Sequence, residues 1–123
     1  MLQSLKLPKN SPGQIAEDFA VKLLEHKGYK VLERNFHSRF GEIDIIAEES
    51  GTLVFVEVKA RWSLKFGAPE EAVTSSKLFK IRKTAEYYAL LNSKTDRKMR
   101  IDVVAIEIAG GLVTSSKILT VGP

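Results

Sequence analysis

Two strongly apolar segments, residues 41–48 and 52–60, flank the short turn Glu49-Ser50-Gly51. Isoleucine dominates the first segment and valine the second, and both residue types favour extended strands. A glycine in so short a connection is typical of a β-hairpin. The sequence therefore predicts two adjacent antiparallel strands around which the rest of the chain must fold.

Helical patterns lie on both sides of this hairpin. Residues 13–27 place apolar side chains on one face at helical spacing, and Gly28 follows as a typical C-terminal stop. Residues 76–92 repeat the helical spacing. We therefore expect one amphipathic helix before the hairpin and one after it.

Further strands complete the predicted sheet. Strand character occurs at residues 29–36 and 100–109, with an optional edge strand at 112–121, whereas residues 61–75 form an irregular segment. The predicted class is α/β, a mixed β-sheet flanked by α-helices in the order α-β-β-β-α-β.

The chain of 123 residues contains no internal repeat and has the size of one domain. We expect a flexible N-terminal arm at residues 1–12 and a single domain at 13–123. The absence of cysteine excludes disulfides and a thiolate zinc site. With no signal-peptide core and no apolar run of membrane-spanning length, the sequence predicts a soluble cytoplasmic protein without a membrane partner.

Three ionisable residues interrupt the apolar hairpin: Asp44, Glu57 and Lys59. Because strand side chains alternate, Glu57 and Lys59 share one face with Phe55. Charges are rare on strands of this composition unless something compensates them. The group is therefore a candidate site.

A two-residue loop at Ser50-Gly51 would set Asp44 directly opposite Glu57, with their β-carbons about 4.5–5.5 Å apart on one face. Two carboxylates in that arrangement repel unless a cation lies between them. Mg²⁺ or Mn²⁺ fits, because such ions take hard oxygen ligands and activate water next to a phosphate. We expect Lys59 to keep its charge beside these carboxylates and to stabilise the transition state. The alternative is a surface salt bridge with no chemical role.

Weaker candidates lie on the two helices. Glu17 falls at the edge of the apolar face of the first helix, where it either completes a metal site or simply reaches solvent. Lys77, Lys80 and Lys83 recur every three residues at the start of the second helix. They either follow a phosphate backbone or form a solvated face. The net charge of +4 and the pI near 9.4 favour polyanionic partners, nucleic acid above all.

Most of the chain, residues 13–108, resembles the YraN-like bacterial family of predicted endonucleases. That family belongs to the restriction-endonuclease-like PD-(D/E)-x-K superfamily and is distantly similar to archaeal Holliday junction resolvases. The matching motifs, in chain order, are Glu17-Asp18-Phe19-Ala20, Arg34-Asn35-Phe36, Gly41-Glu42-Ile43-Asp44, Phe55-Val56-Glu57-Val58-Lys59-Ala60-Arg61, Phe66-Gly67-Ala68-Pro69-Glu70-Glu71-Ala72-Val73, Lys77 and Arg100-Ile101-Asp102.

The resemblance implies a restriction-endonuclease-like fold and a metal-dependent endonuclease that cuts DNA. It gives the catalytic roles to Asp44, Glu57, Lys59 and Glu17, and adds the main-chain carbonyl of Val58 as a metal ligand. With these residues the expected cofactor is Mg²⁺ or Mn²⁺. The expected DNA contacts are Lys77, Lys80, Lys83 and Arg61. Branched DNA as substrate and a homodimer follow by analogy with the resolvases.

Two other functions stay open on the sequence alone. The same fold could bind nucleic acid or a protein without turnover, although a pure binder gains nothing from paired carboxylates facing phosphates. A phosphodiesterase acting on RNA or on a nucleotide would use the same groups.

Overall fold

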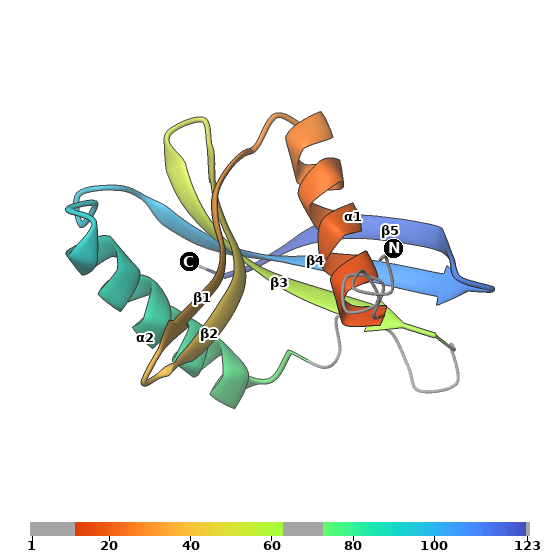
Figure 1. Ribbon diagram of the computed structural model, residues 1–123. Helices are drawn as coiled ribbons and strands as arrows, with labels where there is room; N and C mark the ends of the chain where they lie inside the picture. The colour runs from red at the N-terminus through yellow and green to blue at the C-terminus, as the bar shows by residue number, and fades with distance from the viewer. Residues whose placement is uncertain (1–11, 63–72, 123) are drawn as a thin grey trace, which may run out of the picture.

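The computed structural model describes residues 12–62 and 73–122. Within them the chain forms two helices and five strands (Figure 1), namely α1 (Pro12–His26), β1 (Lys30–Ser38), β2 (Gly41–Glu49), β3 (Thr52–Arg61), α2 (Ser75–Leu91), β4 (Met99–Ala109) and β5 (Leu112–Gly122). The predicted α/β class is confirmed, and the optional edge strand is present as β5. The predicted arm, except Pro12, and residues 63–72 of the predicted irregular segment lie outside the described residues.

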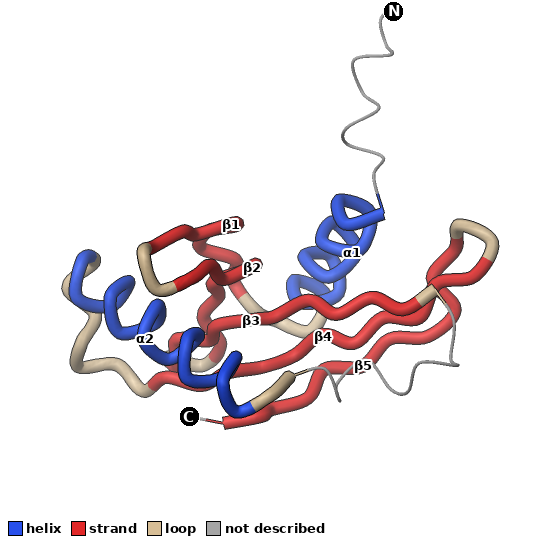
Figure 2. The backbone as a smooth tube through the Cα atoms, turned by 90° about the horizontal axis from the view of Figure 1, so that it is seen from below, coloured by secondary structure: helices blue, strands red, loops and turns tan. Residues whose placement is uncertain are grey.

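The five strands form one mixed sheet in the order β1-β2-β3-β4-β5. The β3–β4 pair is parallel and the other pairs are antiparallel. Because parallel neighbours need a crossover connection, α2 lies between β3 and β4 in the chain. In Figure 2 the β1–β2 hairpin curls out of the plane of β3–β5 and lies beside α2.

The β2–β3 turn sets the register of the central hairpin. Ser50 and Gly51 have φ angles of 50° and 83°, and positive φ at both loop residues is the requirement of the tightest hairpin turn. Glu49 accordingly pairs with Thr52, and Ile46 with Phe55. The predicted two-residue loop is confirmed.

Each helix covers its own face of the sheet, with a separate apolar core beneath it. The core under α1 contains Ala16, Ala20, Leu24, Ile45, Val54, Val56, Val104, Ile106 and Ile108. The core under α2 contains Ile43, Ile46, Leu53, Phe55, Ile81, Ala85, Tyr88, Ala89 and Ile101. Neither described helix has the length and apolarity needed to cross a membrane.

The regular alternation of side chains breaks within the β1–β2 hairpin. Arg34 contacts α1 through Glu17, whereas Phe36, two residues later, packs in the core under α2. Their partners on β2 are divided in the same way, since Ile45 lies under α1 and Ile43 under α2. Asn35, between the two, has a φ of 54°, a left-handed conformation that asparagine tolerates well. Asp44 therefore lies where the hairpin turns from one core to the other.

Candidate active site at the fork between β2 and β3

Asp44 lies where β2 and β3 separate. The paired register ends at Ile45 and Val56, and the Asp44 carboxylate then accepts a hydrogen bond from the Val58 backbone N–H at 2.8 Å. The predicted direct opposition of Asp44 and Glu57 is wrong. The prediction assumed that side chains alternate without interruption along β2. The β1–β2 hairpin bends at Asn35 and Asp44, and the alternation is lost there.

The surroundings of Asp44 oppose its ionisation. Burial raises the pKa of its carboxyl to about 6, and the Val58 N–H offsets only part of that rise. The negative charges of Glu57, Glu17 and Glu42, in decreasing order, raise the pKa further. A cation next to Asp44 would relieve both the burial and the repulsion.

Glu57 faces the other side of β3, toward α2, and is 7% exposed. One of its carboxylate oxygens lies 3.2 Å from the Lys59 ammonium and 2.8 Å from the Lys77 ammonium. The predicted pairing of Glu57 and Lys59 on one face of the strand is confirmed. The second lysine comes from the first turn of α2.

The two lysines are not equivalent. Burial, followed by the neighbouring Lys77, lowers the pKa of Lys59. For Lys77, burial also disfavours the charge, but hydrogen bonds to Glu57 and Lys59 outweigh it and raise its pKa. As expected, Glu57 favours the charged form of Lys59, but burial and the neighbouring Lys77 outweigh it, so the pKa of Lys59 is lowered overall.

The sequence analysis placed Lys77 on a phosphate-binding face and missed its contact with Glu57. A topological signal was available. A helix that connects two parallel strands runs back along them, so its first turn lies near the C-terminal end of the preceding strand. Lys59 is near that end of β3, and Thr74 caps α2 by accepting a hydrogen bond from the Lys77 N–H.

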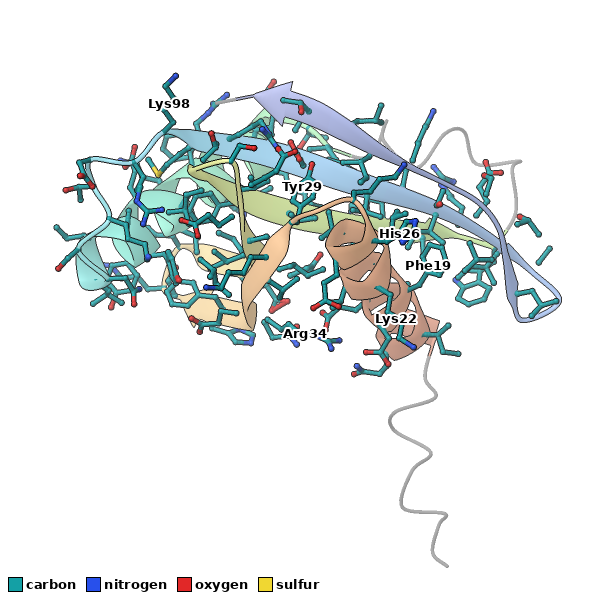
Figure 3. The ribbon with its side chains drawn as sticks, turned by 90° about the horizontal axis from the view of Figure 1, so that it is seen from above. Phe19, Lys22, His26, Tyr29, Arg34 and Lys98 are labelled. Atoms are coloured by element: carbon teal, nitrogen blue, oxygen red, sulfur yellow. The ribbon has the colours of Figure 1, made fainter. Side chains whose placement is uncertain are left out.

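Glu17 leans into the molecule from α1 and is 9% exposed. Its carboxylate accepts hydrogen bonds from both Nε and Nη2 of Arg34, at 3.0 and 2.6 Å, and from the Asn35 amide at 3.1 Å. Arg34 lies between β1 and α1 in Figure 3. The alternative that Glu17 simply reaches solvent is wrong, and Arg34 and Asn35 tie it to the hairpin beside Asp44.

A cleft of about 480 Å³ brings several predicted site residues together at the N-terminal end of α1. Its lining includes Glu17, Asp44, Val58 and Lys59, and it lies on the α1 side of the sheet. Glu57 and Lys77 approach the same fork from the α2 side. The candidate site therefore has two parts, the cleft with Glu17 on the α1 face and the Glu57–Lys77 pair on the α2 face. Asp44 and the Val58 peptide lie between them at the fork.

The oxygen donors at the fork are of the kind that Mg²⁺ or Mn²⁺ prefers: two carboxylates and a main-chain carbonyl. Within residues 12–62 and 73–122, no three acidic or histidine side chains are grouped closely enough to hold an ion by themselves. Mg²⁺ does not require three, since it commonly keeps several waters. Asp44 and Val58 line the cleft on the α1 side, where the raised pKa of Asp44 marks the point of excess negative charge, whereas Glu57 lies on the α2 side and is paired with two lysines.

The remaining predicted DNA contacts are spread around the site. Lys80 and Lys83 are exposed on α2, and the Lys83 ammonium lies 5.6 Å from the centre of the Phe79 ring. Arg61 ends β3 and is aligned with Glu107 on β4. Neither Lys80 nor Lys83 contacts the carboxylates at the fork in the described hydrogen bonds and ion pairs.

Comparison with known proteins identifies the family. The model of the uncharacterised protein family UPF0102 matches residues 16–106. A UPF0102 protein of Persephonella marina is 49% identical over 94 residues, covering 76% of this chain and 81% of the relative. A second one, from Caldicellulosiruptor bescii, is 50% identical over 99 residues, covering 80% and 83%. The chain therefore belongs to the UPF0102 family.

Proposed function

We propose that the protein is a metal-dependent endonuclease that hydrolyses DNA phosphodiester bonds, with a restriction-endonuclease-like fold. One observation carries the proposal: the Asp44 carboxylate on β2 accepts a 2.8 Å hydrogen bond from the Val58 N–H on β3. Val58 lies between Glu57 and Lys59, which form an ion pair on the same strand. Two carboxylates and a lysine, fixed by adjacent strands, are the groups that metal-assisted phosphodiester hydrolysis needs.

Asp44, Glu57 and the Val58 carbonyl would hold the ion. A divalent ion there supplies charge neutralisation at the phosphoryl group and activates water for attack. Lys59, whose pKa is lowered by burial and by Lys77, would orient the attacking water. Lys77 keeps its charge and suits the stabilisation of the transition state. Glu17, held by Arg34, positions the α1 wall of the cleft.

DNA is the favoured substrate because the net charge is +4 and exposed lysines continue along α2 from the site. Branched or otherwise structured DNA and a homodimeric enzyme remain part of the proposal by analogy with resolvases.

Cleavage of labelled four-way junction, flap, single-stranded and duplex DNA, with Mg²⁺ or Mn²⁺, tests the proposal. Native protein is compared with Asp44→Asn, Glu57→Gln and Lys59→Met, purified identically. Glu48→Gln is the matched control, because Glu48 is also an ion-paired strand glutamate but pairs with Arg97. We expect the native protein and the control to cut while the three site variants lose at least a hundredfold in rate. Equal cleavage by all five proteins would assign the activity to a contaminant and remove its support. RNA of the same sequences distinguishes a ribonuclease.

A binding module without turnover is the second candidate. Two lysines already neutralise Glu57, and Arg34 and Asn35 already engage Glu17. A site so well paired could be structural. Binding of DNA without cleavage, by native protein that takes up no metal ion, would favour this candidate.

A further inference from the structure

The outer face of α2 exposes an unusual amount of apolar surface. Phe79, Leu90 and Tyr87 are 58%, 69% and 40% exposed. A groove of about 500 Å³ runs between this face and the β1–β2 turn, lined by Arg39, Phe40, Lys83, Glu86, Tyr87 and Leu90. Exposed apolar clusters rimmed by charge commonly mark interaction sites.

The aromatic rings in this α2 groove and beside it are paired with cations. The Arg39 guanidinium lies 5.0 Å from the centre of the Phe40 ring, and the Phe40 and Tyr87 rings meet edge to face with centres 6.4 Å apart. On the same helix the Lys83 ammonium lies 5.6 Å from the Phe79 ring. Rings interleaved with basic groups suit a ligand that carries both flat rings and negative charge.

Charge selects among the ligands that could cover this face. Helix α2 carries four basic residues and one acidic residue, Glu86. The basic residues are Lys77, Lys80, Arg82 and Lys83. A second copy of the helix would bring like charges together, which disfavours a dimer through α2. A polyanion is attracted instead.

Helix α2 connects the α2 groove with the Glu57 side of the candidate active site. Lys77, on the first turn of α2, contacts Glu57, and Lys80 and Thr84 lie against Gly41 at the start of β2. From Lys77 to Tyr87 the helix rises about 15 Å. That length corresponds to roughly four nucleotides of a stacked strand.

We propose that the α2 groove binds an unpaired stretch of nucleic acid next to the scissile bond. Bases stack on Tyr87 and Phe40, while Arg39 and Lys83 contact the phosphates. Duplex bases are already stacked on one another and cannot use the rings, so the groove favours single-stranded segments. The proposal rests on the proposed function for its substrate and adds the strand state that the substrate must have.

Binding measured in EDTA separates this proposal from catalysis. Fluorescence anisotropy compares labelled single-stranded and duplex 20-mers on native protein and on Tyr87→Ala, Tyr87→Trp, Lys83→Glu and Lys22→Glu. Lys22 is the matched control, an exposed lysine on α1 and on the opposite face of the sheet (Figure 3). Lys83→Glu serves as the second test if Tyr87→Ala, which loses contacts to Phe36 and Phe40, fails to fold.

We expect tighter binding of the single strand, weakened roughly fivefold to a hundredfold by Tyr87→Ala and retained by Tyr87→Trp. Lys83→Glu should weaken binding and flatten its salt dependence, and Lys22→Glu should not. Equal affinity of native protein and Tyr87→Ala for the single strand, or no preference over duplex, would overturn the proposal. So would binding to phosphatidylglycerol vesicles that Lys83→Glu abolishes while DNA binding persists. If the protein binds single strands in this way but does not cut DNA, the proposal for the α2 groove holds and the proposed nuclease function is contradicted.

Discussion

Two aspartates in the same sheet have opposite surroundings. Asp102 on β4 is fully buried, and its carboxylate accepts hydrogen bonds from Arg100, Tyr29 and Thr120 at 2.8–3.1 Å. Asp44 on β2 accepts one from the Val58 N–H and lies near the charges of Glu57, Glu17 and Glu42.

The contrast separates a carboxylate that the fold neutralises from one that the fold leaves among like charges. Donors that neutralise Asp102 on several sides make it part of the fold. Asp44 is partly buried among like charges, an arrangement that costs stability. Such a cost is typical of a site whose charges are arranged to bind a ligand rather than to stabilise the ligand-free fold.

The largest expected effect on stability comes from removing the ionic partner of Asp102. Arg100→Ala leaves Asp102 buried without its ionic partner and should lower the free energy of unfolding by about 3–5 kcal/mol. Urea denaturation at pH 7 measures it. Lys98→Ala, an exposed lysine two residues earlier (Figure 3), should change stability by less than about 0.5 kcal/mol. A similar small loss in Arg100→Ala would remove the contrast.

Asp44→Asn should act in the opposite direction. The pKa of Asp44 is raised from 3.8 to about 6, so the folded state holds this proton more tightly than the unfolded chain. That contribution to stability is complete below pH 3.8 and is lost as the pH rises through 6. At pH 8 in EDTA the variant should be more stable than the native protein by up to about 3 kcal/mol.

Urea unfolding between pH 4 and 8 measures this difference. Asp18→Asn provides a control of opposite sign, because a hydrogen bond from Arg34 lowers the pKa of Asp18, and ionised Asp18 therefore stabilises the fold. If Asp44→Asn instead destabilises the protein at pH 8, Asp44 is structural like Asp102.

Tyr29→Phe should cost about 1 kcal/mol at neutral pH, since the hydroxyl donates to Asp102 and accepts from Arg100. Burial, and then the hydrogen bond to Asp102, raise the pKa of Tyr29 to about 12. Its contribution is therefore complete below pH 10 and is lost as the pH rises through 12. Alkaline unfolding followed by circular dichroism should show this loss of stability in the native protein. The Tyr29→Phe variant should not show it. An unchanged alkaline transition would show that Tyr29 is not part of the network.

Lys77→Met has the smallest expected effect on stability, below about 1 kcal/mol, because the Lys77 side chain is partly exposed. It should nevertheless raise the pKa of Lys59, because it removes a neighbouring positive charge. NMR titration of lysine Cε resonances measures the shift, with Lys80→Met as the control. An unmoved Lys59 would mean that the two lysines do not interact.

The central hairpin was predictable because its information is local. Ser50-Gly51 specifies the turn, the turn specifies the register from Glu49 and Thr52, and alternation then places Glu57 and Lys59 together. Helical spacing placed Glu17 at the edge of the apolar face but left open whether it leans inward, because the contacts that hold it come from Arg34 and Asn35 on β1.

The errors arose where local rules stop applying. Asn35 adopts a positive φ and turns the hairpin, so extending the register from Ile45 to Asp44 placed that carboxylate incorrectly. Lys77 reaches Glu57 from another element, and no spacing within α2 indicates such a contact. The α2 groove depends equally on the β1–β2 turn packing beside a helix distant in sequence.

Calorimetric titration of Mn²⁺ into the native protein at pH 7.5 tests the central claim most directly, because Asp44 is ionised there and available to an ion. Asp44→Asn, Glu57→Gln and the Glu48→Gln control are titrated in parallel. The account predicts that native protein and Glu48→Gln bind the ion, while Asp44→Asn and Glu57→Gln bind it at least tenfold more weakly. Native protein that binds no Mn²⁺, or site variants that bind it as tightly as the control, would contradict the assignment of the fork between β2 and β3 as a metal-dependent active site.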